Sequence, residues 1–205
     1  MNVHWTTEPD GHLDPKVTRD GAGSVEPKTI IDIFRNTVEK HGTENAMALK
    51  RKVDGKLPTE WKTWSYQEYY AECKAFAKTL IKLEVSAYKI VNIIGFNSPE
   101  WFIANLGSIL GGCIAAGIYS TNTPEACMYI SDHSKAEVVC CDGNKQLQKY
   151  AKMYKQLPKL KCIVVWDEVI DPAIKSQFNG VSVMSWEEFL AHGESIDDAV
   201  VNTLI

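Results

Sequence analysis

The segment Trp101–Tyr119 carries no charged side chain, and this constrains the fold of the chain more than any other feature of the sequence. An uncharged run of about 18 residues or more is typical of a membrane-spanning helix, and Gly107 and Gly111 have the spacing that lets such helices pair. The adjacent Gly111 and Gly112 argue against one continuous helix, because a glycine weakens a helix interior by about 1 kcal/mol. We therefore expect a buried helix that the glycines bring close to a sheet, a break at the double glycine, and then a buried strand.

From Ile90 onward, short apolar segments alternate with segments that begin with helix-start signals. Ser98 and Thr123 can each cap a helix, and each is followed by a proline and a glutamate, which favour the first turn. Alternating strands and helices are typical of βαβ units. The expected fold class is α/β, with a mostly parallel sheet covered by helices on both faces. Strands are predicted over 90–96, 111–120, 136–142, 161–167 and 180–184, and helices over 98–110, 123–134, 145–157 and 186–192.

The first part of the chain shows a different pattern. Residues 1–28 lack the apolar core of a secretory signal and are rich in glycine, proline and aspartate, so we expect a disordered or loosely packed tail. A helix over 29–42 is predicted from Thr29 and Asp32, a variant of the capping box, with Gly42 at its end. Its expected apolar stripe consists of Ile30, Ile31, Phe34 and Val38.

A β-hairpin is predicted over 46–64, with Asp54–Gly55 as its turn. The helix predicted over 65–83 begins with a capping box of Ser65 and Glu68. Its expected buried face consists of Tyr69, Cys73, Phe76, Ala77, Leu80 and Leu83. Another face carries Lys74, Lys78 and Lys82, which we interpret as a solvated stripe.

Composition excludes some classes of protein. The net charge of -4 argues against a nucleic-acid partner, because binding phosphates needs a basic surface. The six cysteines form no CxxC pair, so we expect reduced thiols and a cytoplasmic location. Cys140 and Cys141 are neighbours, but adjacent residues of a strand point to opposite faces, which argues against a redox pair.

A basic segment lies within this acidic chain. Between Gly143 and Trp166 there is no acidic residue. Two interpretations stay open: a solvated helix face, or a surface that meets anionic lipid headgroups in peripheral contact with a membrane such as the endoplasmic reticulum. The lysines of this segment are Lys145, Lys149, Lys152, Lys155, Lys159 and Lys161.

No short catalytic motif is present. The sequence has no G-x-G-x-x-G after a strand, no P-loop, no G-x-S-x-G and no H-E-x-x-H. The helix start at Asn97–Glu100 offers free backbone N–H groups for an anion, but Glu100 already lies at this positive end, which favours simple capping. The residues alone therefore indicate an α/β chain without a recognisable catalytic constellation.

The order of the predicted elements, together with "GFNSPEWF" and "AGIYSTNTPEAC", resembles the N-terminal part of the adenylate-forming, or AMP-binding, superfamily. Within it, these segments are most similar to long-chain acyl-CoA synthetases of the bubblegum type, and the resemblance covers about residues 29–195. One departure is Tyr88–Lys89 where the family often has Gly-Asp, which puts a tight turn there in doubt. On this basis residues 1–28 form the tail and residues 29–205 a partial N-terminal α/β domain.

The resemblance implies a ligase that activates a long-chain fatty acid with ATP and Mg²⁺ and transfers the acyl group from AMP to coenzyme A. The family's Ser/Thr/Gly-rich phosphate loop and its later motifs are missing from the sequence. We therefore carry over no catalytic, cofactor-binding or metal-binding residue. We expect a fragment, a truncated isoform or a partial gene model, that binds none of these cofactors alone, is inactive, and has the missing C-terminal part of the enzyme as its partner. The alternatives are a non-catalytic truncated interaction module and an unrelated nucleotide-binding α/β protein.

Overall fold

The computed structural model describes residues 6–8, 10–52, 55–85 and 87–204. Its strands are β1 (Asn45–Leu49), β2 (Lys62–Ser65), β3 (Ile90–Ile94), β4 (Ile114–Ile118), β5 (Val138–Asp142), β6 (Cys162–Trp166) and β7 (Ser182–Ser185). Its α-helices are α1 (Ile30–His41), α2 (Tyr66–Lys82), α3 (Pro99–Leu110), α4 (Pro124–Ser134), α5 (Gly143–Ala151), α6 (Pro172–Lys175), α7 (Trp186–His192) and α8 (Asp198–Asn202). Short 3-10 turns occur at Ala22–Ser24 and Tyr154–Gln156.

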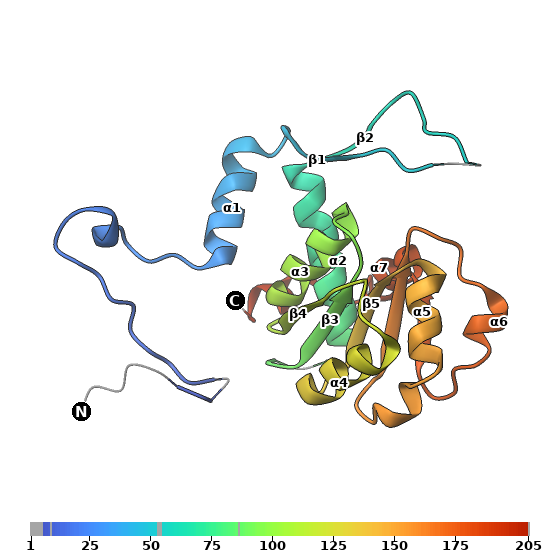
Figure 1. Cartoon of the computed structure of the whole chain (residues 1–205). Coiled ribbons are helices and arrows are strands. Elements are labelled where there is room, and N and C mark those ends of the chain that lie inside the picture. The colour runs from blue at the N-terminus through green and yellow to red at the C-terminus, as the bar shows by residue number, and fades with distance from the viewer. Residues whose placement is uncertain (1–5, 9, 53–54, 86, 205) are drawn as a thin grey trace.

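A five-stranded parallel sheet forms the centre of the molecule, with the strand order β4-β3-β5-β6-β7 (Figure 1). The predicted α/β fold with a mostly parallel sheet is confirmed. Strands β1 and β2 pair antiparallel as a separate two-stranded sheet, which confirms the predicted hairpin. The predicted hairpin turn at Asp54–Gly55 lies partly outside the described residues.

Helices cover both faces of the central sheet and bury two separate apolar clusters. Val138 and Cys140 belong to the cluster that includes residues of α2, α3 and α7, whereas Val139 and Cys141 belong to the cluster with α4 and α5. All four side chains are fully buried, and each large buried aliphatic side chain contributes about 1.5–3 kcal/mol. The two neighbouring cysteines therefore point to opposite faces, as the strand period predicts, and all six cysteines are buried.

The uncharged segment divides into α3 and β4, with Gly111 as the helix C-cap and Gly112 at φ 72°. The predicted break is confirmed, and no helix in the described part of the chain is long and apolar enough to cross a bilayer. Two details were wrong. Gly107 brings α3 close to helix α2 rather than to the sheet, because a Cβ there would lie 2.8 Å from Cβ of Phe76. Strand β4 is not buried, since it lies at the edge of the sheet and Ile114 is 41% exposed.

Helix α1 has the predicted capping box: the Asp32 N–H donates to Thr29 Oγ1, and the Thr29 N–H donates to Asp32 Oδ2. Ile31 and Phe34 are buried against α2, but Ile30 is 57% exposed, so its place in the apolar stripe was wrong. In the contact with α2, the ring of Phe34 packs against the rings of Tyr69 and Tyr70. Gly42 closes the helix in a right-handed conformation, not as a left-handed cap.

Helix α2 also begins with its predicted capping box of Ser65 and Glu68. We interpreted the stripe of Lys74, Lys78 and Lys82 as solvated, but in the structure these lysines bind the C-terminal part of the chain. Lys74 and Lys78 both pair with Asp198 of α8 at 2.5 Å, and Lys82 Nζ donates to a carbonyl oxygen at 2.7 Å. This interpretation failed because the partners lie more than a hundred residues away in the sequence.

Three further differences concern local backbone. The helix predicted over 145–157 ends at Ala151, and Tyr154 lies in a 3-10 turn where its hydroxyl donates to the Gln177 carbonyl. Helices α6 and α8 were not predicted, although each begins with an aspartate cap. A tight turn does precede β3, since Tyr88 adopts φ 64° and its N–H donates to the Gly112 carbonyl.

Candidate functional site at the carboxyl edge of the sheet

The strand order creates a topological switch between β3 and β5. The connection from β3 leads to β4 on one side, and the connection from β4 returns across β3 to β5 on the other. In open α/β sheets, ligands bind beside the carboxyl ends of the strands at such a switch. The side chains that follow these strand ends therefore define the candidate site.

One arginine and two carboxylates join the hairpin to this edge. Arg51, which follows β1, donates from Nη1 and Nη2 to the two carboxylate oxygens of Glu100 at 3.0 and 3.1 Å. Its Nε contacts Asp167, which follows β6. Burial opposes the guanidinium charge, but the hydrogen bonds and charge of Glu100, with Asp167 and Asp142, raise the pKa of Arg51 above its usual value. Arg51 is thus a fixed cation whose Nη1, Nη2 and Nε atoms each already face a carboxylate.

Asp142 lies at the switch itself, as the last residue of β5. Its Oδ2 accepts the Phe96 N–H from the segment after β3 at 3.3 Å. Burial raises the pKa of Asp142, which the Phe96 hydrogen bond partly opposes. The backbone at Gly95 approaches closely here, because a Cβ would lie 2.5 Å from the Trp166 ring and 2.6 Å from Cβ of Asp142. A cavity of about 430 Å³ opens above these groups, between the segments that follow β1, β3, β5 and β6.

The two helix N-termini at the switch are closed by the chain's own oxygen atoms. At α3, Ser98 Oγ accepts the Trp101 N–H, and Glu100 lies in the first turn. At α5, Glu168 Oε2 accepts the Asn144 N–H at 2.7 Å and its side-chain amide at 3.1 Å. A helix N-terminus attracts anions through free N–H groups and its positive dipole end. At each N-terminus an internal oxygen atom therefore already accepts one of the N–H groups that a phosphate would use, and a carboxylate lies beside it.

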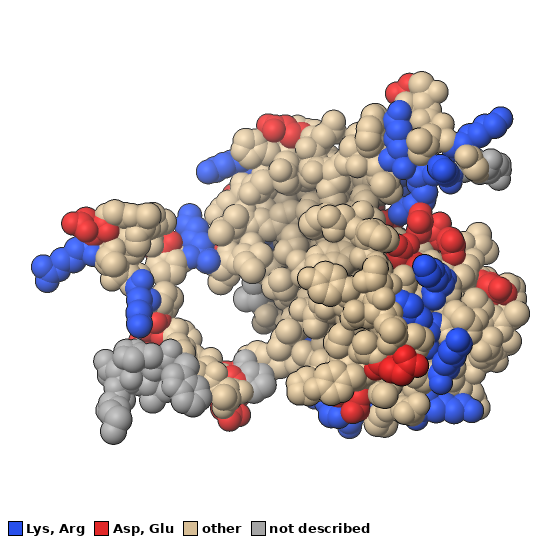
Figure 2. All heavy atoms as spheres, in the orientation of Figure 1, with Lys and Arg blue, Asp and Glu red and all other residues tan. Residues whose placement is uncertain are grey.

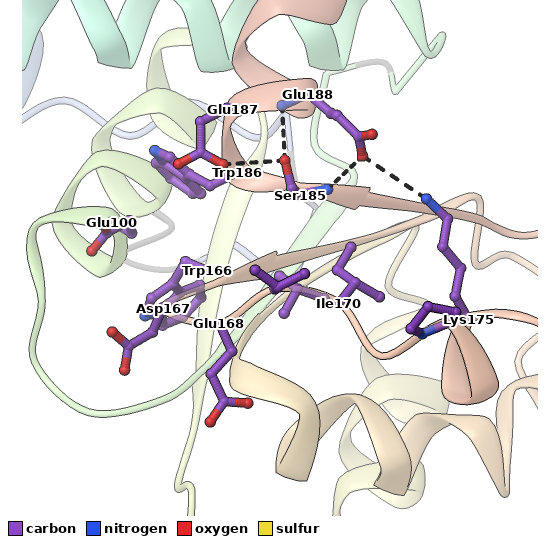
Figure 3. A pocket seen from close by; sticks show the side chains of 13 residues that line it. Glu100, Trp166, Asp167, Glu168, Ile170, Lys175, Ser185, Trp186, Glu187 and Glu188 are labelled. Carbon is purple, nitrogen blue, oxygen red and sulfur yellow. Dashed lines mark hydrogen bonds and ion pairs between the residues drawn. The ribbon is translucent and has the colours of Figure 1, made fainter. Parts of the chain in front are cut away.

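A second cavity, of about 630 Å³, lies between the ends of β6 and β7 (Figure 3). The rings of Trp166 and Trp186 contribute to its wall, and Ser185 Oγ donates to Glu187 and accepts the Glu188 N–H. Glu188 also lies 4.0 Å from the ammonium of Lys175. These polar groups therefore serve mainly to cap α7. The acidic side chains of the lining are Glu100, Asp167, Glu168, Glu187 and Glu188.

A third cavity, of about 590 Å³, lies beside the carboxyl ends of β3 and β4. Its lining includes three aromatic residues, Phe96, Trp101 and Tyr119, and the two glycines Gly95 and Gly117. It contains no charged residue, in contrast to the other two cavities. The carboxyl edge is thus acidic toward β6 and aromatic toward β4.

A nucleoside triphosphate with Mg²⁺ does not fit this edge as the chain presents it. Five carboxylates line the cavity between β6 and β7, and its lysine, Lys175, already faces Glu188. In the cavity above Asp142, three carboxylates balance the three cations of the lining, which are Lys50, Arg51 and Lys52. Desolvating a polyanion next to such carboxylates is unfavourable. Among the described residues, no group of three or more His, Cys, Asp or Glu side chains is arranged to hold a metal ion.

The sequence reasoning named no site residue, and it missed those that gather here. Asp142 and Asp167 are the last residues of the strands predicted over 136–142 and 161–167, so their position at strand ends could have identified them as candidate site residues. Arg51 carried no such signal, because it follows the hairpin strand and reaches the edge only through the fold. Glu100 was interpreted as a capping residue, and its pairing with Arg51 was not predicted.

Comparison with known proteins assigns the family. A family model described as AMP-binding enzyme matches residues 34–198. The chain belongs to the AMP-binding enzyme family. This AMP-binding chain is 36% identical over 202 residues to the long-chain-fatty-acid–CoA ligase ACSBG2 of Gallus gallus, covering 98% of this chain and 25% of that protein. It is also 36% identical over 205 residues to ACSBG1 of Mus musculus, covering 98% of this chain and 26% of that protein.

The AMP-binding chain spans about a quarter of the length of these curated relatives. Among solved structures, it matches the A-PCP didomain of carboxylic acid reductase from Segniliparus rugosus in complex with AMP, with a TM-score of 0.75 and 18% identity. That match covers 85% of this chain and 28% of the other, and it supports the fold. The predicted resemblance to adenylate-forming enzymes, and to bubblegum-type ligases among them, is confirmed.

Proposed function

We propose that this chain is the N-terminal part of an ATP-dependent long-chain fatty acid–CoA ligase. The observation that carries the proposal is the 36% identity to the Gallus gallus ligase, which extends over 98% of the chain. The complete enzyme would use ATP, Mg²⁺ and coenzyme A to convert a long-chain fatty acid into its acyl-CoA thioester. The chain contributes the parallel sheet and the Arg51-linked hairpin to that enzyme.

A chimera tests this proposal. The matched segment of the Gallus gallus ligase is replaced by this chain, and the purified chimera is incubated with palmitate, Mg-ATP and coenzyme A. We expect palmitoyl-CoA to form at a rate within about tenfold of the intact Gallus gallus ligase, since the sheet does not itself supply the phosphate contacts. A chimera that is folded by circular dichroism but forms no thioester from fatty acids of any length would overturn the assignment.

We further propose that the isolated chain is inactive and binds ATP weakly. Two observations support this proposal. An internal oxygen atom accepts a backbone N–H at each of the two helix N-termini at the switch, and carboxylates outnumber cations in the cavity between β6 and β7. Calorimetric titration of the chain with Mg-ATP should show no saturation at millimolar concentrations. Thioester formation by residues 1–205 alone, above that of a heat-denatured sample, would refute this part.

For location, we propose that the enzyme works in the cytoplasm and touches an anionic membrane through α5 and the 3-10 turn after it. Of the six lysines in the basic segment, Lys149 donates to the carbonyls of Ser120 and Asn122, and Lys161 pairs with Glu137. The other four lysines are exposed and make no hydrogen bond or salt bridge within the described part of the chain: Lys145, Lys152, Lys155 and Lys159.

Vesicle sedimentation tests the membrane contact. Lys145, Lys152 and Lys155 are changed to glutamate, which leaves the structural Lys149 intact, and binding to vesicles with anionic phospholipid is compared with the wild-type chain. Each lysine near an anionic surface contributes about 1 kcal/mol, so binding should fall by at least tenfold. The matched control changes Lys16, Lys28 and Lys40, which lie outside this surface. Equal binding by both variants would favour a solvated helix face.

A further inference from the structure

Strand β4 exposes an apolar surface at one edge of the sheet, which we call the β4 edge surface. Its members are Phe96, 72% exposed, Phe102, 43%, Ile114, 41%, and Tyr119, 81%. Figure 2 shows a broad face without lysine, arginine, aspartate or glutamate where Figure 1 places α3 and β4. The sequence accounts for this face, because no charged residue occurs between Glu100 and Glu125. Contiguous apolar surface of this kind marks a site of association.

The backbone of β4 is prepared to accept another strand. Its five residues pair with β3 in regular parallel register, and the Ile114 N–H donates to the Lys89 carbonyl on the β3 side. Peptide groups alternate in direction along a strand, so the N–H and C=O groups of Ala115 and Gly117 point away from β3. β4 is the last strand on this side of the sheet formed by the described residues.

Natural edge strands are normally protected by a lysine, a proline, a bulge or a covering element. β4 has neither lysine nor proline, and its pairing with β3 shows no register shift. The opposite edge differs, because Glu188 accepts the Ser185 N–H at the end of β7 and lies 4.0 Å from the ammonium of Lys175. Of the two edges of the central sheet, β4 is therefore the less protected one.

We propose that the β4 edge surface is the docking site for the remaining part of the AMP-binding enzyme, which adds a β-strand to β4 and covers the surrounding aromatic side chains. This inference rests on the proposed function, and it names the surface and the mode of assembly. The length of the relatives indicates this occupant. The chain spans only 25–26% of its curated relatives, so about three times its own length of polypeptide in such an enzyme has to pack against it. A strand from that part satisfies the outward peptide groups of Ala115 and Gly117 and buries Phe102 and Ile114.

Hydrogen exchange tests the docking directly. The chain is co-expressed with the part of the Gallus gallus ligase that lies outside the match, and amide exchange is compared with that of the chain alone. We expect the Ala115 and Gly117 amides to exchange rapidly in the isolated chain and at least about 100-fold more slowly in the complex, because outward amides gain a partner only on strand addition. Failure to form a complex, or a complex in which these amides are unprotected, overturns the proposal.

A variant pair separates docking from folding. Gly117→Lys places a charge on the edge, and its Cβ would meet the Trp101 ring at 3.4 Å, an ordinary contact, so the chain should fold. Val169→Lys is the control, since Val169 is 92% exposed on another part of the molecule. We expect Gly117→Lys to reduce co-purification of the remaining part at least tenfold and Val169→Lys to leave it unchanged. Equal co-purification with both variants contradicts the proposal.

Two further readouts separate the occupants and the two hypotheses. If the isolated chain sediments as a dimer with protected Ala115 and Gly117 amides, a second copy is the occupant and the proposal is wrong. Acyl-CoA formation by the co-expressed pair reports on the function independently. If the Ala115 and Gly117 amides are protected in the pair but no acyl-CoA forms, the docking proposal is supported and the ligase assignment is contradicted. If acyl-CoA forms but these amides still exchange rapidly, the ligase assignment is supported and the docking proposal is contradicted.

Discussion

The substitution Gly143→Ala tests how the carboxyl edge is held together. Gly143 begins α5 at φ 67°, and a Cβ there would lie 2.8 Å from Glu168 Oε2. The neighbouring atom is the end of a flexible side chain, so Glu168 should move away and lose its hydrogen bonds to the N–H and side-chain amide of Asn144. The helix N-terminus is then left without its acceptor.

The expected loss has two parts. A non-glycine residue in the left-handed region costs about 1 kcal/mol. The lost bonds to Glu168 are partly exposed, and at about 0.5–1.5 kcal/mol they bring the total to about 1.5–2.5 kcal/mol. Gly180→Ala is a matched control, because Gly180 has φ 78° but no atom lies within 4 Å of its Cβ position. Only the backbone cost of about 1 kcal/mol applies there.

Urea unfolding followed by tryptophan fluorescence measures both free energies of unfolding. Gly143→Ala should be less stable than Gly180→Ala by about 0.5–1.5 kcal/mol. This difference should disappear when both are made in a Glu168→Ala background, since the hydrogen bonds are then already absent. Equal destabilisation of the two glycine variants in the wild-type background, or a difference that persists without Glu168, would refute the reasoning.

The remaining predictions concern charge and thiols. Arg51→Met should cost about 1–3 kcal/mol because it leaves Glu100 buried without its partner, while the double variant with Glu100→Gln should recover most of the loss; additive losses in the double-mutant cycle would contradict this. Hydrogen bonds and charge from Lys74 and Lys78 lower the pKa of Asp198 to about 2, so its contribution to stability is full above the ordinary value of 3.8 and is lost as the pH falls through about 2. Asp198→Asn should therefore lower the free energy of unfolding at pH 7 by a small amount, under about 1 kcal/mol for a surface pair, and the difference from wild type should shrink between pH 4 and pH 2; a difference that grows in acid would contradict this. All six cysteines are buried, so a thiol reagent such as DTNB should label none within minutes in the native chain and all six in urea; rapid native labelling would show that the structure opens.

Local sequence patterns predicted those parts of the fold that depend on residues a few positions apart. The capping boxes of α1 and α2 join residues three apart, so their sequence is sufficient to place the helix starts. The break in the uncharged segment was predictable for the same reason, because adjacent glycines act on their own turn. The relation to AMP-binding enzymes was predicted from the resemblance of longer segments to that family, because the periodicity of apolar residues carries no information about family.

Features that depend on strand order could not be predicted in this way. An apolar strand at an edge and one in the middle of a sheet have the same composition, so β4 was expected to be buried. The bidentate pair of Arg51 and Glu100 joins residues 49 positions apart, and the site at the carboxyl edge exists only once β3 and β5 are neighbours. The left-handed turn at Tyr88 was also missed, since tertiary contacts hold a residue type that rarely adopts this conformation.

The close contact at Gly107 has a mechanical consequence. At Gly107 the backbone of α3 lies directly against the Phe76 side chain of α2, so only one layer of side chains separates the two helices there. Helix α1 also packs on α2, through Phe34 against Tyr69, and the Tyr69 hydroxyl donates to the Phe102 carbonyl of α3. These three helices should therefore move as a single rigid unit. Any conformational change that involves these helices should then be confined to the loops that connect the rigid unit to the rest of the chain.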